Sequence, residues 1–595
     1  MRLYLFLLTV GSLPAAEPNR IFFAHGAPSK ATIFISNADG GEEHSLLQST
    51  SLDYNPSWSP DGRWIVFTSE RNGSADLYRV KPDGSGLEQL TDNPAYDDQA
   101  AFSPDSDRIV FVTTRANGHA NLWTMDLRTR KATPLTSGAD GGNFRPSWSP
   151  DGKWIAFSSD RGSTLPMGKG RWEHLQIADV YLIHPDGSGL KRLTEHGNFC
   201  GSPKWSGDSK RVVAYCMSGE ETLTYRIPPQ TIKQGETRLV SIDIASGETA
   251  NVAAGPGVKM APAFLPSGEV AYIRKAAGAP GIFYNMGQPG PKGSDLRSAS
   301  WSPDGTRVVY HRVGPSSGPA PKLWSRNPNY DLRSGALASF DPSGEHYAAP
   351  DFAGLLIFDN NSNSSPPRPI FKPEGRIAIS ASWSPRGDTI LLGLGAFNAF
   401  QFKGDFSTGR VDGGAQVAMI KPDGSGFREV TSGANNNGFP SFAPDGKRFV
   451  YRTAGPEGQG LRIMDLETNK VTTLTTEYDN FPLWSPRGDL IAFVRQYHGD
   501  YEIFTIHPDG KSTRRLTYSP GNDAHGSWSP DGQWIVFSST RMGFKDEALY
   551  TDGPQPYGEL FVMRHDGTHV QQLTDNQWED GGATWQPTPK VGVKH

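Results

Sequence analysis

The sequence predicts an all-β protein made of tandem β-propellers, and three observations support this fold class. An aromatic residue followed closely by turn residues recurs twelve times along the 595 residues, at a mean spacing of about 48 residues. Short runs of alternating apolar residues follow each copy, and no unit has helical periodicity over ten residues. The 67 glycines and 47 prolines supply many turns. Four short antiparallel strands repeated at this period are typical of propeller blades.

The unit between Ser57 and Asp92 illustrates the four strands. "PSW", ending at Trp58, is the first strand, and "SPDG" is a tight turn because proline fixes one φ angle and glycine adopts a left-handed one. "RWIVFTS" alternates as a second strand, while "ADLYRV" and "LEQLT" flank the turn "KPDGSG" as the third and fourth. The twelve repeated aromatic residues are Trp58, Phe102, Trp148, Trp205, Phe264, Trp301, Phe340, Trp383, Phe442, Trp484, Trp528 and Trp585.

The two ends of the repeat region predict how the propeller closes. "RIFFAH" near the start is a second strand without a first, and "ATWQP" near the end is a first strand without the other three. Because twelve blades exceed the usual four to eight, we expect two rings of six; one twelve-bladed ring or a five-plus-seven division are the alternatives. The segment from Arg20 resembles that from Arg307, which places the crossing near Ser302 to Gly305. The predicted propellers are residues 17–303 and 304–595.

The first sixteen residues are typical of a secretory signal peptide. Arg2 precedes an apolar run from Leu3 to Val10 and then "GSLPAAEP", which predicts cleavage after Ala15 or Ala16. The run is too short to span a bilayer. A buried N-terminal strand is the alternative interpretation. We therefore expect a periplasmic or secreted protein without a transmembrane segment.

The charge indicates which kinds of partner to expect, and the two cysteines raise the question of a disulfide bond. The formal net charge of −5 is spread without a basic stripe, so we expect no nucleic-acid partner. We also expect the protein to be a monomer. Cys200 and Cys216 lie at equal distances from a turn near residue 208. In an exported protein, this arrangement predicts a disulfide, provided that the two strand positions satisfy disulfide geometry.

The full repeat "WSPDG…IVFTS…DLY…VKPDGSG…QLT" resembles that of the TolB-like, or PD40, propellers. The resemblance extends from about Arg20 to Gln586, although five copies depart from the motif, those at Trp205, Phe264, Phe340, Trp383 and Trp484. It implies an exported protein that docks protein or peptide partners. No α/β domain of the kind that TolB has ahead of its propeller is recognisable here, so membership of the Tol–Pal system stays open.

A search for catalytic motifs favours a binding protein over an enzyme. "GPSSG" at Gly314 to Gly318 matches the nucleophile-elbow pattern but lies between two strands, and there is no H-E-x-x-H, C-x-x-C or phosphate loop. We expect a non-catalytic scaffold for a protein, peptide or glycan, without metal or cofactor. The alternative is a propeller enzyme, a carbohydrate lyase or hydrolase or a peptidase relative, that uses funnel carboxylates or a metal. Candidate metal ligands for that alternative are His25, His119, His311 and His525.

The repeat also predicts which face binds the ligand. In an up-and-down blade the "SPDG" and "PDG" turns share one face, so the long insertions and the residues that begin the first strands share the other. Acidic and amide residues there can alternatively serve only to hydrogen-bond the loops. The candidate ligand-binding residues are Trp172, Glu173 and His174 over Asp97, Asp98, Asn143 and Arg145 in the first ring, and Lys545, Asp546 and Glu547 over Glu579 and Asp580 in the second.

Overall fold

The fold was obtained as a computed structural model, and every regular element described in it is a β-strand. It describes residues 19–138, 141–162, 177–194, 197–218, 236–275, 279–287, 289–314, 323–335, 337–351, 354–360, 365–373, 376–395, 414–547 and 558–587. The signal peptide predicted over residues 1–16 lies outside these ranges. Among the described residues there is no helix with the length and apolar character needed to cross a membrane.

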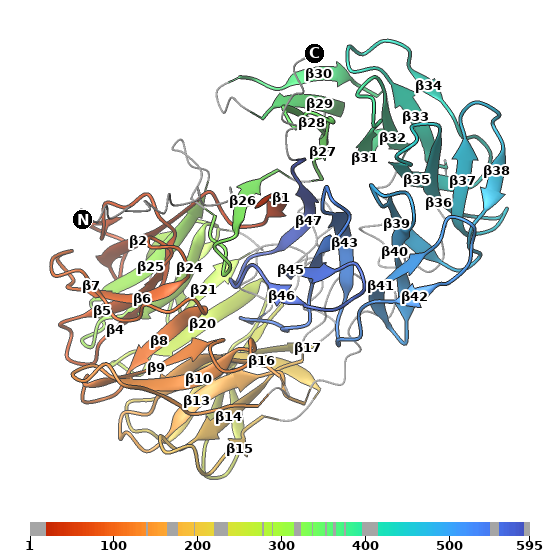
Figure 1. Ribbon diagram of the computed structural model, residues 1–595. Helices are drawn as coiled ribbons and strands as arrows, with labels where there is room; N and C mark the ends of the chain where they lie inside the picture. Colours follow the sequence, from red (N-terminus) through yellow and green to blue (C-terminus); the bar gives the residue numbers. More distant parts are fainter. Residues whose placement is uncertain are drawn as a thin grey trace, which may run out of the picture.

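The first ring has six four-stranded antiparallel blades (Figure 1). Their strands, from the centre outward, are β4–β7 (Asp53–Trp58, Ile65–Ser69, Asp76–Val80, Glu88–Gln89), β8–β11 (Asp97–Phe102, Arg108–Thr113, Asn121–Asp126, Ala132–Pro134), β12–β15 (Asn143–Trp148, Ile155–Ser159, Asp179–Ile183, Lys191–Arg192), β16–β19 (Asn198–Trp205, Arg211–Ser218, Arg238–Asp243, Thr249–Ala253), β20–β23 (Val258–Phe264, Val270–Lys275, Gly281–Tyr284, Pro289–Lys292) and β24, β25, β2 and β3 (Leu296–Trp301, Arg307–Gly314, Lys30–Asn37, His44–Ser45). The innermost strands contact one another in sequence, and β24 contacts β4, so this ring is closed.

The second ring has five four-stranded blades and one of three described strands. Its strands are β27–β30 (Ser339–Phe340, His346–Asp351, Gly354–Asp359, Arg368–Phe371), β31–β34 (Ile377–Trp383, Ile390–Gly395, Gln416–Ile420, Arg428–Glu429), β35–β38 (Asn436–Phe442, Arg448–Ala454, Gly460–Asp465, Val471–Thr473), β39–β42 (Asp479–Trp484, Ile491–Tyr497, Asp500–Ile506, Arg514–Arg515), β43–β46 (Asp523–Trp528, Trp534–Ser539, Glu559–Arg564, Gln571–Gln572) and β47, β1 and β26 (Asp580–Trp585, Asn19–His25, Tyr330–Ser334). Phe22 of β1 packs on Phe340 of β27 with ring centroids 5.0 Å apart, which closes the ring. The all-β, tandem-propeller prediction is confirmed.

The chain passes between the rings twice. β1 pairs with β47 and, in parallel, with β26 in the second ring, whereas β2 pairs with β25 in the first (Figure 1). This pairing differs from the predicted crossing near Ser302 to Gly305, and hence from the boundary between residues 303 and 304. The reason is that the turn there, in which Gly305 N–H donates to Ser302 O at 2.8 Å, joins two strands of one blade.

Local hydrogen bonds in the repeat explain why the same hairpin recurs. In the first blade the Ser59 hydroxyl donates to Asp61 at 2.6 Å and accepts the backbone N–H of Trp64 at 2.9 Å. The repeated aromatic Trp58 is buried with Ile33 and Val309 of the closing blade, so it packs between neighbouring blades. The turn therefore sets the hairpin, and the aromatic residue sets the contact between blades.

Candidate functional site

A left-handed backbone position marks the channel of both rings. The residue three positions before each repeated aromatic has a φ between 48° and 60° in all twelve blades, namely Asn55, Gln99, Arg145, Ser202, Ala261, Ser298, Leu337, Ser380, Phe439, Phe481, His525 and Gly582. Left-handed conformations are uncommon outside glycine, so their recurrence indicates a built-in feature of the repeat. In the first ring all six of these residues line one cavity of about 50 Å³. The register between the first two strands of each first-ring blade shifts at this position, which is a β-bulge, and the bulge brings one residue of each of these blades to the cavity.

In the first ring the channel residues form a hydrogen-bonded polar network. The Asn55 amide donates to both oxygens of the buried Asp98, at 2.9 and 2.8 Å, and the Thr68 hydroxyl donates to the same carboxylate. The Arg145 guanidinium donates to Ser298 Oγ at 2.9 Å and to Asn55 Oδ1 at 3.2 Å. Four blades are thereby joined across the channel, because these residues belong to β4, β8, β12 and β24.

A loop of the second ring closes the mouth of this channel. Asp546 is buried and accepts two hydrogen bonds from the Arg145 guanidinium, one from Nε at 2.8 Å and one from Nη2. Burial raises the pKa of the Asp546 carboxyl to about 7, although Arg145 opposes this shift. The Gln99 amide donates to Lys545 O at 3.0 Å, so the backbone of the loop is held as well.

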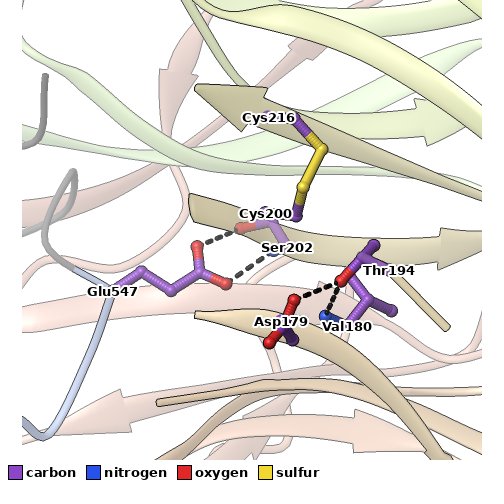
Figure 2. The surroundings of a disulfide bond; sticks show 7 residues. All are labelled: Asp179, Val180, Thr194, Cys200, Ser202, Cys216 and Glu547. Atoms are coloured by element: carbon purple, nitrogen blue, oxygen red, sulfur yellow. Dashed lines mark hydrogen bonds between the residues drawn. A yellow bond between two sulfur atoms is a disulfide. The ribbon is translucent and has the colours of Figure 1, made fainter. Parts of the chain in front are cut away.

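Glu547 occupies a socket made entirely of first-ring donors. Its carboxylate accepts hydrogen bonds from the Ser158 hydroxyl at 2.5 Å, from the N–H and hydroxyl of Ser202 at 2.5 and 2.7 Å, and from the Tyr215 hydroxyl at 2.6 Å. Figure 2 shows Glu547 reaching Ser202 next to the Cys200–Cys216 disulfide. A fully buried carboxylate needs such donors, because its desolvation is costly.

Two further charge clusters lie where the rings meet. The Lys545 ammonium pairs with Glu559 and Asp575, and Asp575 also accepts from the Arg326 guanidinium at 2.7 Å. Burial raises the pKa of the Glu559 carboxyl to about 7 even though Lys545 opposes this. These contacts hold the base of the 541–547 loop on the second ring, while Asp546 and Glu547 reach into the first.

The second of these clusters contains His25 and Asp580. His25 Nδ1 lies 2.6 Å from Asp580 Oδ1, and Glu70 of the first ring accepts from Tyr54 and Trp578. Burial acts to lower the pKa of His25, but Asp580 outweighs this effect, with Glu70 and Glu559 adding to it, so the pKa is raised. The cluster joins the chain ends to the first ring.

The predicted site residues are therefore only partly brought together. Asp97 is buried in an ion pair with Arg115, and Asn143 accepts from Arg161, so both support local loop structure. Lys545 and Glu579 line one small cavity of about 30 Å³. Asp546 and Glu547, in contrast, reach into the channel mouth of the first ring. Glu579 is half-buried and accepts from Gly558 N–H at 3.2 Å. Trp172, Glu173 and His174 lie outside the described residues.

The channel of the second ring has a different chemistry, which the sequence reasoning missed. Phe439, Phe481 and His525 come from adjacent blades and contact in series, with ring centroids 4.4 and 4.2 Å apart. All three are half-buried. Burial lowers the pKa of His525 to about 3, so its imidazole is neutral near pH 7. The signal that could have found them is their shared position three residues before the repeated aromatic.

The four histidines considered as metal ligands do not gather. His311 accepts the Asn55 backbone N–H at 3.3 Å in the first ring, and His25 bonds Asp580 between the rings. His119 lies in the loop before β10, where its backbone N–H donates to Asn117 at 3.1 Å, and His525 lies in the second channel. Within the described ranges, no group of three or more His, Cys, Asp or Glu is arranged to hold a metal ion.

Comparison with known proteins adds a family match. The PD40 family model, described as the TolB beta propeller domain, matches residues 12–117, 96–241 and 415–552. A TolB homologue of Chlorobium luteolum is 34% identical over 179 residues, 28% of this chain and 40% of that protein. The Tol-Pal system protein TolB of Francisella tularensis subsp. mediasiatica is 27% identical over 244 residues, 40% of this chain and 50% of that protein. An uncharacterised protein of Agrobacterium fabrum is 34% identical over 140 residues, 21% of this chain and 46% of that protein.

The chain thus spans half or less of the length of these curated relatives. Among solved structures, TolB from Acinetobacter baumannii is 13% identical with a TM-score of 0.28, over 83% of this chain and 82% of that one. The tricorn protease is 14% identical with a TM-score of 0.37, over 91% of this chain and 53% of that one.

Proposed function

The chain belongs to the PD40 family of TolB beta propeller domains, and from this premise we propose that it is an exported, non-catalytic binding protein. Its ligand is a protein, peptide or glycan of the cell envelope or its surroundings. One relative is named as a Tol-Pal system protein, which supports a macromolecular partner. The predicted signal peptide and the Cys200–Cys216 disulfide support an oxidising compartment, the periplasm or the exterior.

The observation that carries the proposal is the aromatic series in the second channel. Half-buried aromatic side chains on a rigid scaffold bind apolar side chains or sugar faces at low entropic cost. Phe439, Phe481 and His525 are held by backbone bulges of three separate blades, so their relative positions are preset. We place the ligand here because the equivalent mouth of the first ring is filled by Asp546 and Glu547.

The remaining candidates take two roles in this proposal. Asp97, Asp98, Asn143 and Arg145 position the first ring's loops and its junction with the second ring, since their side chains are already bonded within the protein. Trp172, Glu173 and His174 stay proposed ligand contacts at the rim of the first ring.

Affinity capture tests the proposal. The immobilised mature chain is exposed to an envelope extract, the captured partner is identified by mass spectrometry, and the purified partner is then titrated. We expect the double substitution Phe481→Ala and His525→Ala to weaken binding at least tenfold, because the loss of each ring that contacts the ligand costs about 1–2 kcal/mol or more of binding free energy. Melting curves and circular dichroism verify that the variant is folded.

The matched control is Phe427→Ala, an aromatic residue 39% exposed beside a "KPDG" turn on the other face. Equal loss in both variants, or no loss in the channel variant, would contradict the proposed site. Thermal melting with calcium, manganese or EDTA addresses the metal-using enzyme alternative, which predicts a strong shift with one of the metals.

A further inference from the structure

Lys204 is a charged side chain in the first ring's channel that the proposed function does not use. It precedes Trp205 at the end of β16 and lines the 50 Å³ cavity with Ser57, Ser298 and Ser300. The side chain is half-buried, and among the described residues no carboxylate or other acceptor lies within bonding distance of its ammonium group. An ammonium group that no acceptor of the described residues bonds is available to a ligand anion.

The neighbouring charges are already engaged elsewhere. The Asp546 carboxylate accepts the hydrogen bonds of the Arg145 guanidinium. The Glu547 carboxylate accepts hydrogen bonds from Ser158, Ser202 and Tyr215. Burial and the nearby Arg145 lower the pKa of Lys204 to about 8, which Glu547 partly offsets. Near pH 7 the cavity therefore presents a positive charge that has no bonded counter-ion.

We propose that this cavity is a binding site for a carboxylate group, with the Lys204 ammonium as its anchor. Two of the serines that line the cavity, Ser57 and Ser300, offer hydroxyl groups to the carboxylate. The Ser300 oxygen accepts the Trp58 N–H at 3.1 Å, which leaves its own O–H to donate. The hydroxyl of Ser57 has no hydrogen-bond partner in the described part of the chain. A cavity of about 50 Å³ has room for a carboxylate group.

The ligand can reach the cavity from only one end of the first ring's channel. Asp546 and Glu547 fill the loop-face end of the channel, so the ligand enters from the face of the "SPDG" turns. This carboxylate site is in the other ring from the ligand site proposed above, and either can fail without the other. The carboxylate belongs to a small free acid or to an acidic side chain at the end of a peptide.

Thermal melting of the mature chain and its Lys204→Met variant tests the site. At constant ionic strength, we expect sodium acetate or succinate in place of chloride to raise the wild-type Tm by about 2–4 °C and to leave Lys204→Met unchanged. In chloride alone, Lys204→Met should melt at a temperature no lower than that of the wild type, because the substitution removes no hydrogen bond or ion pair of the ammonium group.

The control is Lys210→Met, an exposed lysine on the next turn, which should respond to carboxylates as the wild type does. A lower Tm of Lys204→Met in chloride would show that Lys204 has a structural partner and would overturn the proposal. Equal carboxylate shifts in wild type and Lys204→Met would overturn it as well.

Two peptides distinguish the sources of the carboxylate. Gly-Gly-Asp-amide and Gly-Gly-Asn-amide differ only in the charged group, and each is titrated into the wild type by calorimetry. Binding of the Asp peptide without binding of acetate or succinate assigns the site to a peptide side chain, and binding of the small acids assigns it to free carboxylates. Absence of binding by all of these probes would refute the site.

Discussion

Gly201 shows how closely the two rings fit at the scale of single residues. A Cβ atom placed on it would lie 2.5 Å from Glu547 Oε1 and 2.7 Å from the Tyr215 hydroxyl. Its φ angle is not in the left-handed region, so the requirement for glycine here is space for the carboxylate and not backbone freedom. Glu547 is fully buried, which makes the socket sensitive to small changes.

Gly201→Ala therefore tests the socket. The added methyl group must displace either the Glu547 carboxylate or the Tyr215 ring, and overpacking of this kind costs about 1–3 kcal/mol. We expect a lower urea midpoint in equilibrium unfolding. Gly207→Ala is the matched control, because no atom lies within 4 Å of its added Cβ. Equal midpoints for the two variants would show that the Glu547 socket adjusts without cost.

Sequence reasoning at this scale selected the right residue types but not their partners. Arg145, Asp546 and Glu547 stood out as charged residues in loops of the same face. Arg145 and Asp546 are 401 residues apart, and neither belongs to a motif with fixed spacing. A contact between two propellers depends on how the rings dock, and that is not encoded in the repeat that folds each ring.

At the scale of elements, the tight turns were predictable because their bonds are local. Ser59, Asp61 and Trp64 lie within six positions and hydrogen-bond to one another. The sequence motif alone therefore predicts the hairpin. The bulge at the channel gave no such signal. Its twelve positions carry residues as different as Asn55, Ala261 and Phe439, and only one is glycine. Neighbouring strands impose that conformation, so composition does not reveal it.

The disulfide belongs to the same scale, because it ties β16 to β17 beside the socket (Figure 2). Cys200 and Cys216 are directly opposed in register, as the symmetric placement about residue 208 predicted. The bond closes a loop of 16 residues, for which the chain-entropy relation gives about 3 kcal/mol.

Replacing both cysteines by serine should therefore lower the free energy of unfolding by about 3 kcal/mol, measured by urea denaturation. A reducing agent should lower the Tm of the wild type and leave the Cys200→Ser, Cys216→Ser variant unaffected. Mass spectrometry under non-reducing conditions provides an independent check. Two free thiols in the mature chain would refute the bond.

At the scale of the whole molecule, strand exchange between the chain ends and the middle links the rings. β1 completes the second ring with β47, although β2, which follows directly, completes the first. The repeat predicted that the ends meet, because each lacks the strands that the other supplies. The predicted boundary between residues 303 and 304 assigns the strand at Arg20 to the first ring, whereas β1 pairs with β47 of the second; the second strands at Arg20 and Arg307 share one pattern, so the repeat does not distinguish them.

The junction that results contains several groups that bind protons more tightly in the folded protein. The pKa of His25 is raised by Asp580 against the effect of burial, and burial raises those of Asp546 and Glu559 to about 7. Each therefore carries more protons in the folded than in the unfolded state between its two pKa values. Stability from these groups falls as pH rises through the folded values and recovers as pH is lowered.

Acidification from about pH 8 to about pH 6.5 should accordingly raise the Tm by a few degrees, as measured by scanning calorimetry. Lys204, whose pKa is lowered to about 8, opposes this trend within the window but is one group against three. The window ends near pH 6.5 because the pKa values of His311 and His525 are lowered by burial, so these residues also oppose the trend below the unfolded value of about 6.5. Glu559→Gln removes one of the contributing carboxyls and should flatten the dependence. A pH dependence of Tm in Glu559→Gln equal to that of the wild type would show that Glu559 does not take up a proton at the junction in this window.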